Sequence, residues 1–191
     1  MTAIKIVILV FSLMISVNYS YALTITSLWG DQDSFDGKVT SDPFVWWMDL
    51  NNEGPTLDDV RFSGEKSWTH NYILPNNFSI TSVSFEIFHG GDGSEGHSPL
   101  SINGNLIGNL TQVDGYSTFL DTFNIPSNLL SIFMNGSAAI TVSPVAGYHD
   151  EWALDYSKLT ITGSQVPIPS SLLLLGSSIL GLGVLRRFRK N

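Results

Sequence analysis

Apolar and polar side chains alternate over short stretches between residues 23 and 165. In the segment 82–87, Val83, Phe85 and Ile87 fall on one face, and two serines and Glu86 fall on the other. A period of two residues is typical of a strand with one buried face. Similar stretches, separated by clusters of Gly, Asn, Asp and Pro, predict strands at 23–29, 44–48, 67–74, 106–110, 117–123, 138–142 and 152–161.

Turn signals connect these strands. Asn103-Gly104 lies between apolar residues, which predicts a tight hairpin. Residues 129–135 predict either a short helix or a strand. Few stretches show helical periodicity, and roughly eight or nine strands fit into a domain of this size. The pattern therefore predicts an all-β domain over residues 23–165, a two-sheet β-sandwich of jelly-roll type.

The N-terminal residues 1–22 predict a signal helix that is removed on export. Lys5 precedes an almost wholly apolar run over 6–17, and small residues stand at Ser20 and Ala22. A cation, an apolar core and a small-x-Ala ending are the layout of a secretory signal, cleaved by signal peptidase after Ala22. The alternative is an uncleaved anchor, but an apolar run of about 12 residues is short for a membrane span.

The C-terminal residues 166–191 have three parts. Val166-Pro167-Ile168-Pro169 is followed by a Leu-, Gly- and Ser-rich stretch over 170–185, and then by Arg186, Arg187 and two further cations. The apolar stretch predicts a single transmembrane helix, and the cations predict that this end stays in the cytoplasm while the body lies outside. A plain membrane anchor would not explain the proline motif.

This tail resembles the sorting signal of PEP-CTERM proteins. The resemblance covers residues 166–190 and implies processing by an exosortase near the proline motif, in a Gram-negative bacterium that makes exopolysaccharide or biofilm. It also implies an inner-membrane anchor before processing, and the cell surface or extracellular matrix afterwards. The commonest motif has Glu between the prolines, whereas this chain has Ile168. That difference matches a variant branch and implies a different exosortase subtype.

The body is similar to a domain often found with such tails. The similarity rests on Ser-Trp-Thr-His at 67–70, the strand pattern at 80–87 with its following acidic loop, and the last strand at 152–161. It implies a β-sandwich and no known activity.

Charge is distributed unevenly along the chain. All 17 acidic residues lie between Asp31 and Asp155, and only four cations accompany them, so the body carries a net charge of −13 against −8 for the whole chain. Such a surface repels nucleic acid, which is not expected as a partner. It favours either solubility or the binding of a divalent cation such as calcium. The chain has no cysteine, which excludes disulfides and thiolate metal sites.

Two acidic loops are candidate calcium sites. Asp31 and Asp33 belong to a Gly-containing segment that is spaced almost, but not quite, like a calcium loop. Asp92 and Glu95 lie in a second segment, where glycines would let carboxylates and carbonyls converge. The alternative for both is an acidic surface loop without a ligand.

No catalytic motif stands out, and we expect the protein not to be an enzyme. The chain has neither a Gly-x-Ser-x-Gly elbow nor a His-Glu-x-x-His zinc motif. His89 and His97 flank the second acidic loop and are expected to be exposed loop residues. With 17 acids, no carboxylate pair for glycoside chemistry can be singled out.

Aromatic residues suggest carbohydrate as a ligand. Trp46 and Trp47 are adjacent, so on a strand one would face the core and the other the outside, where it could stack on a sugar. Trp29, Trp68 and Trp152 are expected in the core. The leading hypothesis is thus a non-enzymatic surface or matrix protein associated with exopolysaccharide. The alternatives are a carbohydrate-binding module and, third, a secreted glycoside-active enzyme.

Overall fold

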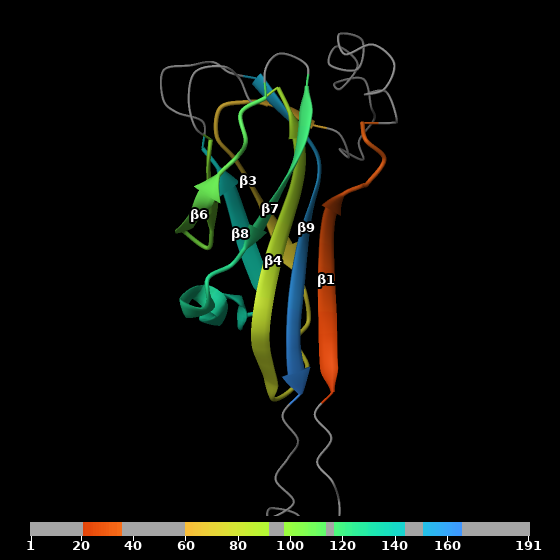
Figure 1. The fold of residues 1–191 in the computed structure, drawn as a ribbon, viewed down its shortest axis with the longest axis vertical. Coiled ribbons are helices and arrows are strands. Elements are labelled where there is room, and N and C mark those ends of the chain that lie inside the picture. The colour runs from red at the N-terminus through yellow and green to blue at the C-terminus, as the bar shows by residue number, and fades with distance from the viewer. Residues whose placement is uncertain (1–20, 36–59, 92–97, 114–116, 144–150, 166–191) are drawn as a thin grey trace, which may run out of the picture.

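The computed structural model describes residues 21–35, 60–91, 98–113, 117–143 and 151–165, which form one β-sandwich (Figure 1). Nine strands and one short 3-10 helix follow one another along them. The elements are β1 (Ala22–Gly30), β2 (Val60–Ser63), β3 (Lys66–Asn71), β4 (Phe78–Gly90), β5 (Pro99–Ile102), β6 (Asn105–Asn109), β7 (Thr118–Asn124), η2 (Ser127–Phe133), β8 (Ser137–Val142) and β9 (Glu151–Gln165).

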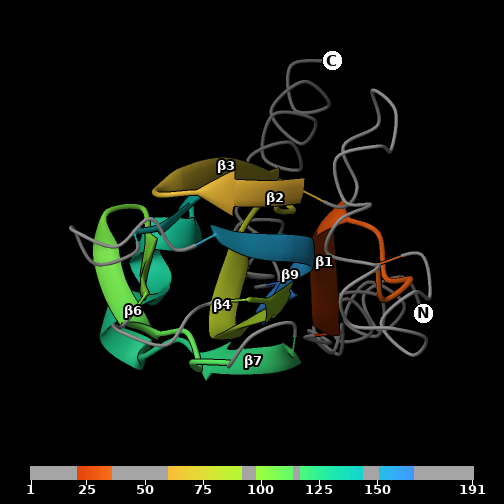
Figure 2. The same cartoon turned by 90° about the horizontal axis from the view of Figure 1, so that it is seen from above.

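The strands form two antiparallel sheets. One has the order β1-β9-β4-β7, with β2 also paired to β9, and the other has the order β3-β8-β5-β6. From β2 onward, each strand is followed by a strand of the opposite sheet, except within the β5–β6 hairpin. Figure 2 shows the sandwich from above, with β1 and β6 on opposite sides. The predicted all-β, two-sheet architecture is confirmed.

The local predictions within these sheets are confirmed in most places. Asn103 and Gly104 have φ of 49° and 75°, so both central residues of the β5–β6 turn adopt the left-handed conformation that a type I′ hairpin requires. Residues 129–135, left open between helix and strand, overlap η2. The sequence pattern missed β2 and β5, which have four residues each, too few to show a period.

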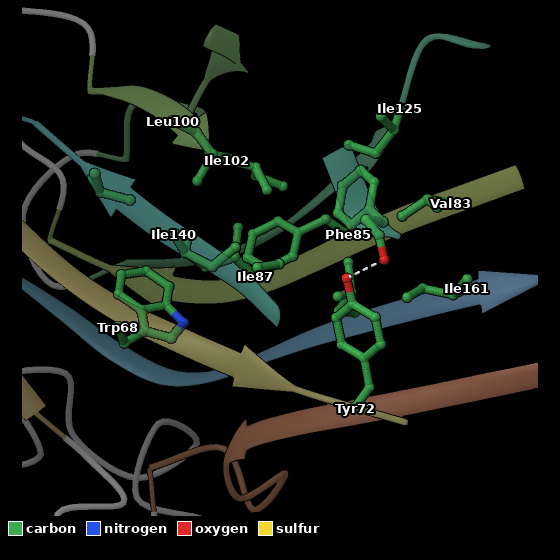
Figure 3. Close-up of a cluster of buried hydrophobic side chains, with 14 of the residues drawn as sticks. Trp68, Tyr72, Val83, Phe85, Ile87, Leu100, Ile102, Ile125, Ile140 and Ile161 are labelled. Atoms are coloured by element: carbon green, nitrogen blue, oxygen red, sulfur yellow. Dashed lines mark hydrogen bonds between the residues drawn. The ribbon is translucent and has the colours of Figure 1, made fainter. Parts of the chain in front are cut away.

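The core lies between the two sheets (Figure 3). Phe85 and Ile87 of β4 face Ile140 of β8, and all three are fully buried. Tyr72 is also buried, and its hydroxyl donates a hydrogen bond of 2.7 Å to the carbonyl of Phe133. A buried hydroxyl needs a hydrogen-bond partner. Because Phe133 is the last residue of η2, this bond also holds the end of η2 against the sheets.

Two of the three tryptophans expected in the core are buried there. Trp68 and Trp152 have relative exposures of 6% and 0%. Trp29 is only partly buried and packs its ring 5.6 Å from that of Trp68. Among the described strands, its strand β1 is at the edge of its sheet and pairs only with β9.

The sandwich has two distinct ends. Ala22 at the start of β1 pairs with Ser164 near the end of β9, so the chain enters and leaves the sandwich side by side, at the lower end in Figure 1. We call this the terminal end. At the opposite end, Gly30 closes β1 and Gly90 closes β4, while β2 and the start of β9 pair with each other. We call this the loop end.

Several predictions fall outside the described residues: most of the signal peptide, the strand at 44–48, and the sorting tail with its transmembrane helix. Among the residues that are described, no helix has both the length and the apolar character needed to cross a membrane.

Candidate functional site

A β-bulge in β9 places a carboxylate at the loop end. Phe88 of β4 pairs with Tyr156, whereas the next residue, His89, pairs with Leu154, so Asp155 is the extra residue between them. On its other edge, β9 pairs with β1 from Tyr156 onward and with β2 up to Leu154. Asp155 therefore sits at the junction of two strands. Bulges are commonly found where a side chain is redirected for function.

The turn after β1 brings two more carboxylates to this junction. Gly30 has a φ of 79°, and a Cβ at this position would lie 2.0 Å from the carbonyl oxygen of Asp155, so only glycine allows the approach. Past Gly30, the backbone N–H of Ser34 donates to Oδ2 of Asp155 at 3.2 Å. One carboxylate oxygen each from Asp31, Asp33 and Asp155 lie within 4.8 Å of one another. We call these three residues the aspartate cluster.

The aspartate cluster is electrostatically costly. Asp155 is fully buried, and its Oδ1 has no hydrogen-bond partner; Oδ1 of Asp31 is likewise buried without one. Burial, followed by repulsion from Asp33 and Asp31, raises the pKa of Asp155 to about 7. Asp31 is partly buried and Asp33 is exposed, but the buried carboxylate of Asp155 beside them is stabilised by a proton or by a cation. Hard cations such as calcium bind oxygen ligands of this kind.

The structure thus unites two sequence-predicted ligands, Asp31 and Asp33, with a third that the sequence reasoning missed. In the sequence, Asp155 falls within the predicted last strand, 152–161, and was not singled out as a ligand. The other two predicted ligands, Asp92 and Glu95, lie outside the described residues; the last described residue before them, Gly91, follows the end of β4 at the loop end.

The predicted sugar-stacking pair, Trp46 and Trp47, also lies outside the described residues. The described residues on either side of that segment are Phe35 and Val60. Phe35 is buried against the ring of Phe88, 5.6 Å away, and Val60 pairs with Leu154. Phe35 and Val60 therefore both lie at the loop end, close to the aspartate cluster.

His89 was expected to be an exposed loop residue, and this is wrong. It lies within β4, fully buried, and its Nε2–H donates to Oδ2 of Asp121 at 3.0 Å. Thr111 donates to the same carboxylate from its backbone N, at 2.6 Å, and from its hydroxyl, at 2.7 Å. Burial alone would raise the pKa of Asp121, but the hydrogen bonds from His89 and Thr111 lower it below its usual value. His97 lies outside the described residues.

The His89–Asp121 pair does not form a hydrolytic triad. Nδ1 of His89 is buried and has no hydrogen-bond partner, so no hydroxyl is bound to the nitrogen that would act as a base. The Thr111 hydroxyl donates to the carboxylate instead. A nucleophile has to be within hydrogen-bond reach of its base, and this arrangement joins β4, β7 and the chain after β6 rather than activating a nucleophile.

A second histidine, His70, joins the two sheets. Its Nε2 is 2.9 Å from the Ser157 hydroxyl, and its Nδ1 is 3.1 Å from the Ser27 hydroxyl. Ser27 donates to the carbonyl of Asn71, so Nδ1 must carry the proton that Ser27 accepts. Ser157 accepts from the Trp68 indole at 2.8 Å and donates to Nε2. Every polar atom is satisfied only while His70 is neutral.

The outer face of the β1-β9-β4-β7 sheet carries an ordered array of short polar side chains. Cross-strand pairing aligns one row across all four strands and a second row across three. The rows are Thr26, Thr160, Ser84 and Asn124, and Thr24, Thr162 and Ser82. All seven are exposed or partly exposed. This face is a second surface that could contact a hydroxyl-rich polymer.

Comparison with known proteins gives only weak likeness. No family model matches the chain, and no curated protein matches it. Among solved structures, latent PorU of Porphyromonas gingivalis aligns with 77% of this chain at 10% identity and a TM-score of 0.39, and this chain spans 13% of PorU.

Two carbohydrate-binding modules also align. One is the CBM36-1 domain of a xylanase from the hindgut metagenome of Trinervitermes trinervoides, with a TM-score of 0.34, 19% identity, and coverage of 53% of this chain and 74% of that one. The other is a family 35 module of Clostridium thermocellum, with a TM-score of 0.34, 13% identity, and coverage of 53% and 91%. Alignments this weak assign the chain to no family and to no function.

Proposed function

We propose that this chain is an exported, non-catalytic jelly-roll module that reaches the cell surface or extracellular matrix and binds polysaccharide there. The observation that carries the proposal is that the two ends of the sandwich differ. Both ends of the domain emerge together at the terminal end, because Ala22 pairs with Ser164. The aspartate cluster lies at the opposite, loop end, as do Phe35 and Val60, the described residues on either side of the segment that contains Trp46 and Trp47.

This arrangement of the two ends suits a domain that is attached to the membrane through its C-terminal tail. β9 ends at Gln165, directly before Val166-Pro167-Ile168-Pro169, so the proposed exosortase site follows the last strand without a linker. Signal peptidase would act after Ala22, the first residue of β1. A domain held at its terminal end turns its loop end away from the membrane. Processing would then release or re-anchor it in the envelope of a Gram-negative bacterium.

Polysaccharide is the partner that the tryptophan pair favours. Trp46 and Trp47 would supply rings for stacking on sugars, and the chain carrying them is joined to the sandwich through buried Phe35. The acidity of the body disfavours anionic polymers, so a neutral polysaccharide is the expected ligand.

The buried histidines support a non-catalytic role. His70 is satisfied on both nitrogens by serines, and His89 is bound to Asp121 with its free nitrogen buried. A general base must reach the proton that it abstracts, and these two rings are both enclosed in the sandwich.

Co-sedimentation with insoluble polysaccharide tests the binding function. The full chain, in mild detergent, is mixed with the exopolysaccharide of the producing bacterium and, separately, with cellulose. We expect retention of the wild type on at least one polymer and a loss of at least about tenfold in Trp46→Ala or Trp47→Ala, which corresponds to about 1.4 kcal/mol. The matched control, Thr26→Lys with Thr160→Lys, alters the outer sheet face and should bind as the wild type does.

Two outcomes would contradict this proposal. If the threonine double variant loses binding while both tryptophan variants retain it, the sheet face is the binding surface and the assignment to the loop end is wrong. If the wild type is retained on neither polymer, the proposed polysaccharide binding itself fails.

A further inference from the structure

The aspartate cluster has a chemistry that neither export nor polysaccharide binding explains. We propose that Asp31, Asp33 and Asp155 bind one calcium ion, which joins the turn after β1 to the bulge in β9. This proposal stands independently of the proposed function.

The spacing of the three carboxylates fits a single ion. Their ligand oxygens all lie within 4.8 Å of one another. Calcium–oxygen bonds measure about 2.3–2.6 Å, so two ligands on opposite sides of one calcium ion are separated by roughly 4.6–5.2 Å. The spacing of the three oxygens is therefore compatible with a single ion between them.

The burial of Asp155 is the independent evidence that the cluster is more than a set of surface acids. Its side chain is fully enclosed, and its Oδ1 has no hydrogen-bond partner, although Oδ2 accepts from Ser34. Oδ1 of Asp31 is also buried and unpartnered. Buried carboxylate oxygens nearly always have a partner, and a cation bound by the cluster would supply one.

The backbone around the cluster is arranged for such a site. The bulge removes Asp155 from the regular ladder, and Gly30 permits an approach to its carbonyl that no other residue allows. Both features cost stability on their own. A cation that links the turn after β1 to the bulge in β9 offsets this cost.

Calcium is the ion that these ligands favour. All three side chains are carboxylates, and the chain has no cysteine to supply a thiolate. Oxygen-only ligand sets select hard cations. Calcium accepts irregular geometry and six to eight ligands, whereas magnesium demands a near-ideal octahedron at about 2.0–2.1 Å. Asp31 and Asp33 come from one turn and Asp155 from a strand, which favours the less demanding ion.

Calcium titration of the full chain tests the proposal. The protein is stripped with EDTA in mild detergent and dialysed free of it, and its Tm is followed by circular dichroism as calcium chloride is added to about 10 mM. Weak calcium modules have a Kd of about 10⁻⁴–10⁻³ M. At roughly 100 times the Kd, we expect Tm to rise by roughly 10 °C. Isothermal titration calorimetry should give one ion per chain.

Asp155→Asn is the decisive variant. It removes one negative charge without changing the size of the side chain, so the metal-free variant should fold and have a Tm at or above that of the metal-free wild type. It should lose the calcium response. Glu86→Gln is the matched control, because Glu86 is an acid on the outer sheet face, paired with Lys158, and its loss should leave the calcium response intact.

Three results would overturn the proposal. The first is a Tm of the stripped wild type that calcium does not change. The second is a calcium response in Asp155→Asn equal to that of the wild type, which would place the ion elsewhere. The third is an equal response to magnesium chloride at the same concentration, which would reject calcium as the preferred ion.

Discussion

The buried imidazole of His70 makes a quantitative prediction about how stability depends on pH. Burial lowers the pKa of His70 from 6.5 to about 4. Between these values the unfolded chain binds a proton that the folded chain does not, so the free energy of unfolding falls as the pH is lowered. The difference between the two pKa values, at about 1.4 kcal/mol for each pH unit, amounts to about 3 kcal/mol. Most of this loss occurs between about pH 6.5 and pH 4.5.

The hydrogen bonds around the His70 ring also predict that the free energy of unfolding falls as the pH is lowered. A protonated His70 would donate from Nε2 to Ser157, which already accepts from the Trp68 indole. The proton of the Ser157 hydroxyl would then lose the acceptor it has in the neutral state. A buried donor without a partner costs about 1–3 kcal/mol, which agrees with the magnitude taken from the pKa.

Urea unfolding of the wild type and of His70→Gln, at several pH values from 7.5 to 4.5, measures this effect. Asp155 titrates in the same range with the opposite sign: its pKa is raised in the folded state, so its contribution to stability is lost as the pH rises. Because both proteins contain Asp155, its contribution cancels in their difference. We expect the wild type to lose about 3 kcal/mol relative to the variant on acidification. Parallel pH profiles would refute the reasoning.

Three further substitutions test the packing. Phe85→Ala removes a fully buried ring between the sheets and should lower the free energy of unfolding by about 3–5 kcal/mol in urea titration. Gly30→Ala places a Cβ 2.0 Å from the carbonyl of Asp155 at a φ of 79°, so it should destabilise by more than about 1 kcal/mol in the same assay; a neutral effect would contradict the close approach. Lys158→Ala breaks a partly exposed ion pair with Glu86 and should change stability by less than about 1 kcal/mol.

Local pattern was enough to predict the architecture and part of the core. The alternation at 82–87 falls within β4, and Asn103-Gly104 forms the predicted hairpin because only those residue types accept the left-handed turn. Continuing the same alternation from Val83 through Ile87 would have placed His89 on the buried face. The misassignment of His89 came from ending the strand too early.

The aspartate cluster could be predicted only in part. Asp31 and Asp33 are close in sequence, so their spacing signals a cation site. Asp155 joins them through pairing between strands far apart in the chain, and a bulge arises from a register shift against β4 that no local period reveals. Sequence order does not show which strand lies beside which, and the third ligand depends on that arrangement.

Export and processing of both termini form the central claim, and the intact mass of the protein recovered from cells tests it most directly. The protein is isolated from membrane and from medium, in strains with and without the candidate exosortase. We predict a chain that begins at Leu23 and ends between Val166 and Pro169, found only when the exosortase is present. A mass that still includes Arg186 to Asn191 in both strains would contradict the account and leave a plain single-span membrane protein.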